Sequence, residues 1–317
     1  MTLLPVKDKV SGNPRKRDPR LYQIGMLSGL LGYGMLWLNF GVPPIQVAGI
    51  LLAALGTQYL CTRLSGLPAF DPKSAVISAL SLCLLLRTNS LGVALAAAGV
   101  AIAGKFLLRW NGKHLFNPTN FSLVLVLASG LGWVSPGQWG QEAYFVFLIG
   151  CLGGLVVNRA ARSDVTYAFL AAYGGLVLGR ALWLGDPLSI PLHQLQNGAF
   201  LIFAFFMISD PQTTPDSRTG RLLFAVLVAL GAVWVQFGLY RTNGLLWSLV
   251  CGALVVPLLD RLFADGRYDW NCPVAVTYPE PIPVPAEPCI QLSLQLSLFP
   301  SEPAFTASSI RSTQPTR

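Results

Sequence analysis

Long apolar runs recur along most of this sequence and are separated by short clusters of charged residues. The runs are about 17–21 residues long, which is the length that a helix needs to cross a bilayer. Only 11% of the 317 residues are charged, against about 25% in soluble domains. A soluble core can be this apolar in one place, but it would not repeat such runs along the whole chain. The pattern predicts an all-α integral membrane protein embedded in the lipid bilayer.

Turn residues and charges divide the apolar part into about ten helices. The predicted helices cover residues 21–40, 45–62, 74–86, 91–108, 121–134, 144–157, 165–184, 198–209, 222–240 and 245–263. The third and the fifth are short even when they are counted from Pro72 and Pro118, because roughly 15–17 residues at 1.5 Å each give about 22–25 Å against a hydrocarbon core of ~30 Å. Such helices must begin or end at membrane depth, where irregular backbone survives only if it is buried in protein or lines a cavity.

The basic residues alternate between the two sides of these helices. Loops that follow odd-numbered helices carry only Arg87, Arg180 and Arg241, and the other loops and the N-terminal tail carry the remaining Lys and Arg. Since basic loops stay in the cytoplasm, we expect a multi-pass protein of the plasma (inner) membrane with both termini cytoplasmic. The formal charge of +8 has this topological explanation, and no basic surface interleaved with aromatic residues indicates a nucleic-acid partner.

Three segments of the chain differ in composition. Residues 1–20 form a basic polar tail, residues 21–263 the polytopic transmembrane domain, and residues 264–317 a tail rich in Pro, Ser and Thr. The polar composition of the last segment predicts a disordered cytoplasmic tail.

Metal chemistry is not indicated. The six cysteines include no C-x-x-C pair, and the histidines are His114 and His193 alone. Zinc and iron–sulfur sites need clusters of such ligands, so no metal site is predicted. No residue is assigned a catalytic role.

Two of the apolar runs open on the same short pattern of Phe, then Asp or Asn, then Pro. The pattern occurs at residues 70–74 (FDPKS) and at residues 116–120 (FNPTN). Asp or Asn can cap the first free amides of a helix, and Pro fits the first helical position. We therefore expect two helix starts on the cytoplasmic side, one in each of two similar half-bundles produced by an internal duplication.

These helix starts are the candidate working site. Paired short segments point to the binding sites of transporters, and helix N-termini favour an anion or an electron-rich carbonyl. A third Asp-Pro pair opens residues 210–215 (DPQTTP) after a later run. For any single segment, a tilted helix with a good cap is an alternative interpretation. The candidate cofactor-binding or substrate-lining residues are Asp71, Pro72, Ser74, Phe116, Asn117, Pro118, Asn120, Asp210, Thr213 and Thr214.

A few other polar residues lie within or beside the apolar runs. We expect Lys105 to snorkel to the interface, and Gln58 and Gln236 to hydrogen-bond between helices. Asp260 is expected to pair with Arg261 or Lys105. No carboxylate lies at the middle of a predicted span, so a proton relay across the bilayer is not evident.

Three anchors resemble the RnfD/NqrB family, which comprises the RnfD membrane component of Rnf electron-transport complexes and the NqrB component of the sodium-pumping NADH:quinone reductase. They are residues 116–118 (FNP), residues 210–215 with Gly220, and residues 257–260 (PLLD); residues 71–74 (DPKS) also fit the family's first half. The resemblance covers about residues 21–263. It implies ten helices in two related halves with short or broken helices and a urea-channel-like architecture, and service in a redox-driven ion pump that binds flavin.

The sequence departs from the family where FMN is attached. The family uses the Thr of a Ser-Gly-Ala-Thr motif, and none of the Ser-Gly pairs here, at residues 28–29, 65–66 and 129–130, continues with Ala-Thr. Covalent FMN is therefore not expected. The remaining candidates for a cofactor near the helix starts are a non-covalent flavin (FMN or riboflavin) and a quinone.

Two functions of different classes follow. The first is a membrane subunit of an ion-translocating, Rnf/Nqr-like electron-transport complex that works with other subunits. The alternative is a stand-alone membrane channel or carrier for a small solute with the same fold, which the missing flavin motif favours.

Overall fold

The computed structural model of the chain describes residues 18–67, 69–135 and 143–268, with side chains for all of these except 143–149. The predicted tails at 1–20 and 264–317 lie outside the described residues, apart from residues 18–20 and 264–268. Helices dominate the described part, and the strands are two residues long.

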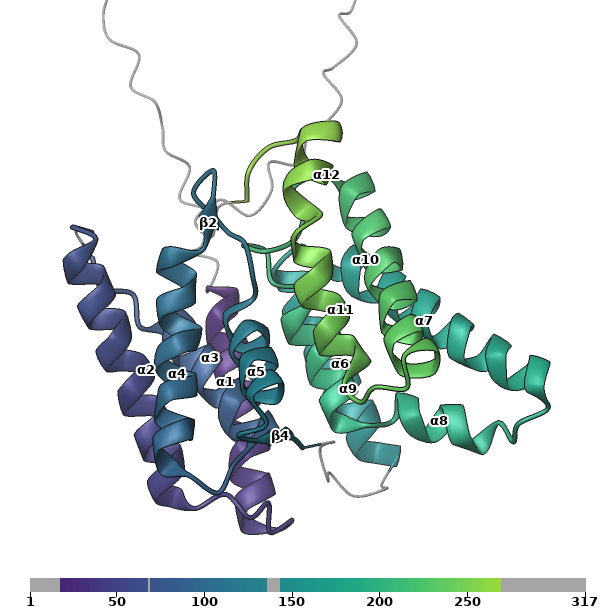
Figure 1. The fold of residues 1–317 in the computed structure, drawn as a ribbon, viewed down its shortest axis with the longest axis horizontal. Coiled ribbons are helices and arrows are strands. Elements are labelled where there is room, and N and C mark those ends of the chain that lie inside the picture. The colour runs from purple at the N-terminus through teal and green to yellow at the C-terminus, as the bar shows by residue number, and fades with distance from the viewer. Residues whose placement is uncertain (1–17, 68, 136–142, 269–317) are drawn as a thin grey trace, which may run out of the picture. The chain divides into compact units, whose positions relative to one another are not determined.

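The first group of elements spans residues 18–135 (Figure 1). Its helices are α1 (Pro19–Leu36), α2 (Pro44–Leu64), α3 (Lys73–Leu85), α4 (Leu91–Leu107) and α5 (Pro118–Ser129). Strand β1 (Leu86–Arg87) pairs with β4 (Trp133–Val134), and β2 (Arg109–Trp110) pairs with β3 (Lys113–His114), both antiparallel.

The second group spans residues 143–262. It contains α6 (Ala143–Arg159), α7 (Ser163–Leu184), α8 (Ser189–Leu195), α9 (Gly198–Ile202), the π-helical segment η1 (Phe203–Met207), α10 (Arg218–Val233), the π-helical segment η2 (Trp234–Gly238), α11 (Gly244–Ala253) and α12 (Val256–Leu262). The two groups meet where α1 packs on α6 and α5 packs on α11.

Side-chain caps explain where several helices begin. Asp18, Ser90, Asn117, Asn197 and Ser217 each accept a backbone N–H from the first turn of α1, α4, α5, α9 and α10. Such oxygens satisfy amides that have no partner within the helix. Helices α1, α2, α5 and α12 also carry Pro in the first two positions, where the missing N–H costs nothing.

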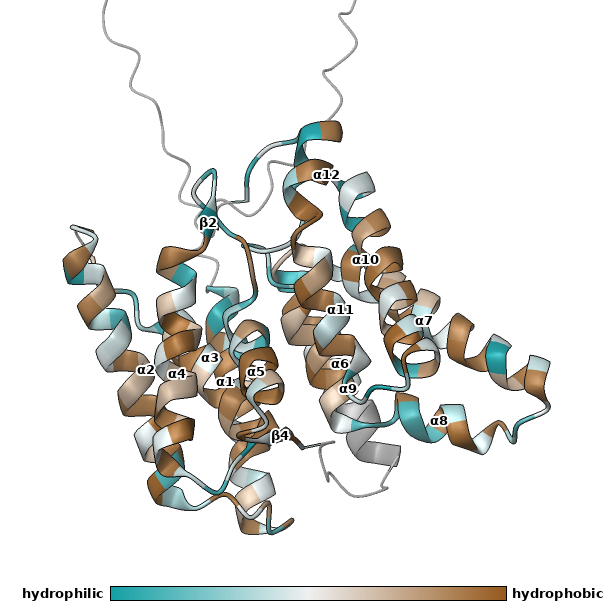
Figure 2. Cartoon of the chain, viewed as in Figure 1, coloured by the Kyte–Doolittle hydropathy of each residue, from teal (hydrophilic) through white to brown (hydrophobic). Residues whose placement is uncertain are grey.

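Small side chains lie where helices pack most closely. In the first group α4 packs on α2, with Gly49 of α2 against Leu95 and Gly99 of α4 against Thr57, and the buried residues of α4 include several alanines. In the second group α10 packs on α7 and α11 with Ala225, Ala229 and others buried. Small residues allow helix backbones to approach one another when no hydrophobic effect drives association. Large apolar side chains fill the core, with Phe169, Phe203 and Phe224 fully buried, and others are exposed on outer faces. Figure 2 shows hydrophobic residues along the helices and hydrophilic ones in the loops.

Three helices of the described residues are long and apolar enough to cross a membrane, namely α2, α7 and the continuous Arg218–Gly238. A fourth span results if α11 and α12, bent by 48° at their junction, act together. Helices α3, α4, α5 and the α9–η1 segment are apolar but shorter. These lengths fit an all-α, multi-pass membrane protein, and the shortness predicted for α3 and α5 is confirmed.

Several predicted boundaries need correction. The expected helix at 245–263 is broken into α11 and α12, and the predicted loop at 185–197 contains α8. The basic stretch 109–114, expected as a loop, is a β-hairpin because Asn111 and Gly112 adopt positive φ angles of 49° and 75°, as the favoured two-residue turn requires.

The expectation that residues 70–74 and 116–120 mark two half-bundles is wrong. Both stretches precede helices of the first group, α3 and α5, which pack on each other. Figure 1 shows the β2–β3 hairpin and α12 at one end of the bundle, which we call the hairpin end, and β4 at the opposite end.

Candidate functional site

A cavity of about 330 Å³ lies between the two groups of elements. On one side its walls come from α1 to α5 and from the β2–β3 hairpin, and on the other from α6, η1 and the loop after η1. Five of the ten predicted site residues line it: Asp71, Ser74, Asn117, Pro118 and Asp210. The structure thus brings all three Asx-Pro stretches to one cavity.

The start of α5 has the local structure that the FNP pattern predicts. The Oδ1 atom of Asn117 accepts the backbone N–H of Asn120 at 3.1 Å, and Pro118 occupies the first turn. The Asn117 amide nitrogen donates to the backbone oxygen of Met207 at 3.4 Å and to Oδ2 of Asp210 at 3.2 Å. One buried side chain therefore caps a helix of the first group and holds the loop of the second.

Asp210 organises that loop. Its Oδ1 accepts the backbone N–H of Gln212 at 3.1 Å, and its backbone oxygen accepts the hydroxyls of Thr213 and Thr214 at 3.3 and 3.1 Å. Burial raises the pKa of the Asp210 carboxyl, although hydrogen bonds from Gln212 and Asn117 act in the other direction. The two predicted threonines shape the turn and do not line the cavity.

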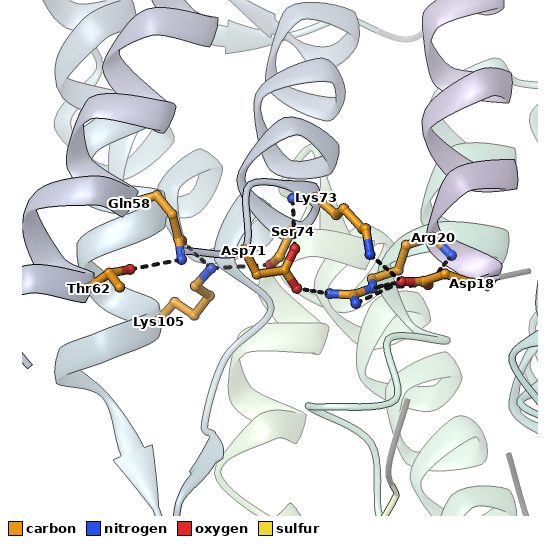
Figure 3. Close-up of polar contacts among 8 residues, drawn as sticks. All are labelled: Asp18, Arg20, Gln58, Thr62, Asp71, Lys73, Ser74 and Lys105. Carbon is orange, nitrogen blue, oxygen red and sulfur yellow. Dashed lines mark hydrogen bonds and ion pairs between the residues drawn. The ribbon is translucent and has the colours of Figure 1, made fainter. Parts of the chain in front are cut away.

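The start of α3 is built differently (Figure 3). Helix α3 begins at Lys73, and Pro72 at its N-cap makes no side-chain cap. The Asp71 carboxylate accepts the backbone N–H of Lys73 at 3.2 Å and a hydrogen bond from the Arg20 guanidinium at 2.5 Å. Asp18 pairs with Arg20 and with the Lys73 ammonium, both at 2.8 Å. We call these four charged side chains the α1–α3 cluster.

The α1–α3 cluster is balanced in charge, with two carboxylates and two cations. Burial alone would raise the pKa of Asp18, but hydrogen bonds from Arg20 and Lys73 hold it at about 2. Asp18 is therefore ionised at neutral pH, and the cluster ties the start of α1 to the start of α3 by charge pairing.

Lys105 lies in the cavity rather than at the interface, so the snorkelling expected for it is wrong. Its side chain points between α2 and α3, where its ammonium donates to Oε1 of Gln58 at 2.5 Å and to Oγ of Ser74 at 3.2 Å. Figure 3 shows this group beside the α1–α3 cluster. The residue is 5% exposed. These two acceptors replace part of its hydration, which is why the side chain can remain inside.

The interhelical hydrogen bonds expected of the two glutamines are confirmed. Gln58 joins α2 to Lys105 on α4, and Gln236 on η2 accepts the Tyr173 hydroxyl of α7 at 3.0 Å.

The other predicted residues lie outside the cavity lining. Phe116 stacks on Phe121, with ring centroids 5.2 Å apart. Asn120 is 1% exposed and donates to the backbone oxygen of Leu246 at 3.1 Å, which joins α5 to α11, and its Oδ1 has no partner among the described residues. These residues and Pro72 support the site without contacting its interior.

A second charged group joins the hairpin to the second group of elements. Lys113 on β3 pairs with Asp216 at 3.0 Å and with Asp260 of α12 at 2.9 Å, and Asp260 also accepts the backbone N–H of Asp216 at 2.8 Å. The predicted pairing of Asp260 with Arg261 or Lys105 is wrong, because the hairpin carries Lys113 to α12. Arg261 instead lies over the Trp110 ring at 5.5 Å.

Sequence reasoning missed four residues of the cavity lining that can carry charge: Arg20, Lys105, Arg109 and His114. Burial lowers the pKa of His114 to about 3, so its imidazole is neutral at physiological pH. The Asn-Gly pair at 111–112 was a usable signal, since it predicts a hairpin that places residues 109 and 114 opposite one another. No group of three or more His, Cys, Asp or Glu side chains that could hold a metal ion occurs within the described ranges.

Residues 123–269 match the NQR2, RnfD, RnfE family. Among relatives, the D component of the ion-translocating oxidoreductase complex of Klebsiella pneumoniae is 33% identical over 138 residues, which cover 42% of this chain and 35% of the relative. The protein of the same description from Alcanivorax borkumensis is 34% identical over 146 residues, covering 44% of this chain and 39% of the relative. The matched part thus spans less than two fifths of the relatives' length. The family match contains the Asp210 wall of the cavity, whereas Asp71, Lys105 and Asn117 precede that match.

Proposed function

We propose that the chain is a membrane subunit of an ion-translocating, Rnf- or Nqr-like electron-transport complex, because residues 123–269 match the NQR2, RnfD, RnfE family. The observation that carries the proposal is where the match falls. It includes η1 and the loop at Asp210, which form one wall of the cavity. The described relatives are subunits of a complex, so other subunits of such a complex are the proposed partners.

The proposed architecture is ten passes through the bilayer in two related halves, α1–α5 and α6–α12, similar to urea channels. The packing supports a repeat, since α2 packs on α4 and α5 on α4 in the first group, while α7 packs on α10 and α11 on α10 in the second. In the second group α9 and α11 begin after Asn197 and Asn243, at the positions that α3 and α5 occupy in the first. An odd number of helices per half inverts the second half, as in many transporters.

The hairpin end is the proposed cytoplasmic side of the plasma (inner) membrane, with both termini on that side. Basic residues lie there, among them Arg109 and Lys113 in the hairpin itself. Positively charged loops remain in the cytoplasm during insertion.

The cavity is the proposed site of a redox group held without a covalent bond, either a flavin (FMN or riboflavin) or a quinone. Its volume of about 330 Å³ lies at the lower end of the range for small-molecule sites. Its lining fits a flat ring with a polar edge, because Phe205, Phe206 and Met207 supply apolar surface while Lys105 supplies a hydrogen-bond donor. A bound flavin or quinone would supply the electron-transfer chemistry, and these residues would hold and orient its ring.

Purification of the full chain from its native membrane in mild detergent tests the assembly. We expect flavoprotein and iron–sulfur subunits to copurify, and membranes lacking the chain to lose ion transport driven by electron transfer. A colourless chain that purifies alone, and whose deletion leaves redox-driven ion transport intact, would contradict the proposal and support the solute channel instead.

A further inference from the structure

Among the described residues, Lys105 differs from its charged neighbours in forming no ion pair. In the α1–α3 cluster, Arg20 and Lys73 are matched by the carboxylates of Asp18 and Asp71. Within the described part of the chain, no carboxylate lies within 4.0 Å of the Lys105 ammonium, whose hydrogen bonds go to the neutral oxygens of Gln58 and Ser74. Figure 3 shows the two arrangements side by side.

The Lys105 ammonium can make one more hydrogen bond. A lysine ammonium has three N–H donors, and two of those of Lys105 are directed at Gln58 and Ser74. Since Lys105 also lines the cavity, the third donor is available to a molecule inside it. His114 lines the same cavity and has a buried Nδ1 without a partner among the described residues.

The surroundings of Lys105 favour a negative charge. A charge that is removed from water is costly unless it is paired. The starts of α3 and α5, with Ser74 and Pro118, line the same cavity, and helix N-termini stabilise anions. Arg109 adds a guanidinium group to the cavity lining besides that of Arg20. Two carboxylates also line the cavity, but Asp71 pairs with Arg20, Asp210 accepts from Asn117 and Gln212, and neither forms an ion pair with Lys105.

We infer that Lys105 binds the phosphate group of a molecule that enters the cavity, with its ammonium as the principal charge partner. The inference rests on the proposed function only in treating this cavity as a ligand site. The phosphate group could belong to a soluble phosphate ester or to the headgroup of an anionic phospholipid, and these sources can be separated by experiment.

Binding of inorganic phosphate to the purified full chain, measured by calorimetry in phospholipid-free detergent, tests a soluble ligand. We compare the wild type with Lys105→Gln and with the matched control Lys73→Gln, which removes the same charge from a side chain that is 37% exposed and pairs with Asp18. Because hydrogen bonds to charged groups are the stronger ones, Lys105→Gln should weaken phosphate binding by about tenfold or more, and Lys73→Gln by less than about twofold.

The lipid source is tested in nanodiscs made of phosphatidylglycerol or of phosphatidylcholine. If the headgroup is the ligand, phosphatidylglycerol raises the thermal midpoint of the wild type but not of Lys105→Gln, and free phosphate has little effect. Two outcomes would overturn the inference. In one, phosphate and lipid change the affinity and the thermal midpoint equally in the wild type and both variants. In the other, neither ligand has an effect on any of the three proteins.

A third measurement uses the wild-type protein and so does not depend on the folding of a variant. The rate at which an amine-reactive reagent modifies Lys105, followed by mass spectrometry, should fall at least several-fold when phosphate or the anionic lipid is bound, whereas the rate at Lys73 stays constant. An unchanged rate at Lys105 would contradict the inference. Binding of a flavin or a quinone is assayed separately by absorption. A failure of the redox proposal therefore appears in the absorption spectrum, whereas a failure of the phosphate proposal appears in the binding and labelling measurements.

Discussion

The starts of α3 and α5 share a sequence pattern but not a structure. At α5, Asn117 is 8% exposed, caps the helix and bonds to the loop at Asp210 in the second group. At α3, the side chain of Asp71 is 46% exposed and bonds to Arg20 within the first group. The α5 start therefore makes a contact between the two groups of elements, whereas the α3 start contacts only neighbouring helices of the first group.

The difference shows what a short helix-start motif can and cannot predict. Asx-Pro specifies a local turn and a polar side chain near the first amides, and both starts have these. Whether that side chain also carries a long-range contact depends on what packs against it. An amide can donate and accept at once, so Asn117 serves both purposes, whereas an ionised Asp71 only accepts and therefore attracts cations.

The largest effect is expected for Asn117→Leu. Loss of the cap costs about 1 kcal/mol, and Oδ2 of Asp210, which loses its hydrogen bond from Asn117, costs about 1–3 kcal/mol more. The free energy of unfolding in detergent, together with function in the complex, measures the change.

Asn111→Leu is the comparison for this variant. Asn111 has a φ of 49° in the hairpin turn, so leucine there costs about 1–2 kcal/mol through backbone strain, but no hydrogen bond between the two groups is lost. Function should be affected more at position 117. Equal loss of function at both positions would remove the special role assigned to the α5 start.

A double-mutant cycle on Asn117 and Asp210 should give the next largest effect. Alanine at each position, alone and together, is expected to show a coupling energy of about 1–3 kcal/mol, in the range for residues that share a buried hydrogen bond. The unfolding free energies of the four proteins provide the value. If the losses of unfolding free energy in the two single variants add up to that of the double variant, the hydrogen bond between Asn117 and Asp210 contributes no coupling energy.

The corresponding double-mutant cycle on Asp71 and Arg20 should give a smaller coupling energy. Exposed ion pairs contribute about 0.2–1 kcal/mol, and Arg20 keeps Asp18 as a partner when Asp71 is replaced. A coupling energy as large as that between Asn117 and Asp210 would show that the two starts are energetically equivalent.

The smallest changes in unfolding free energy are expected from acid titration of Asp18 and Asp210, and the two changes should have opposite signs. The pKa of Asp18 in the α1–α3 cluster is lowered to about 2, so the stability that it contributes is present above its unfolded pKa of about 4 and is lost as the pH falls towards 2. Asp18→Asn should flatten the stability profile there.

At Asp210 burial raises the pKa, so its contribution is present at low pH and is lost as the pH rises through the raised value. Asp210→Asn should therefore remove this loss of stability with rising pH, while its side chain can still accept from Asn117. Unfolding free energies measured across the acid range compare the two variants, and slopes of the same sign would contradict the assignment.

Much of the candidate site was predictable because its chemistry is local. Two of the three Asx-Pro stretches precede helices, α3 and α5, as predicted, whereas Asp210-Pro211 opens a loop. Five of the ten predicted site residues line the cavity. Lys105 was not predictable as a cavity residue, because its sequence neighbours near the end of a helix suit a snorkelling side chain equally well. Its direction is decided by Gln58 and Ser74, which are 47 and 31 residues away in the chain.

The sequence by itself determined that this is an all-α membrane protein with short helices that begin at Asx-Pro turns, since apolar run length and capping chemistry act within a few residues. Only the tertiary structure decided that Asp71 and Asn117 belong to the same group of helices, that Lys113 rather than Arg261 pairs with Asp260, and that Lys105 is buried without a counter-charge among the described residues. Each of these depends on contacts between distant segments, and a charged side chain takes its partner from whatever packing brings near.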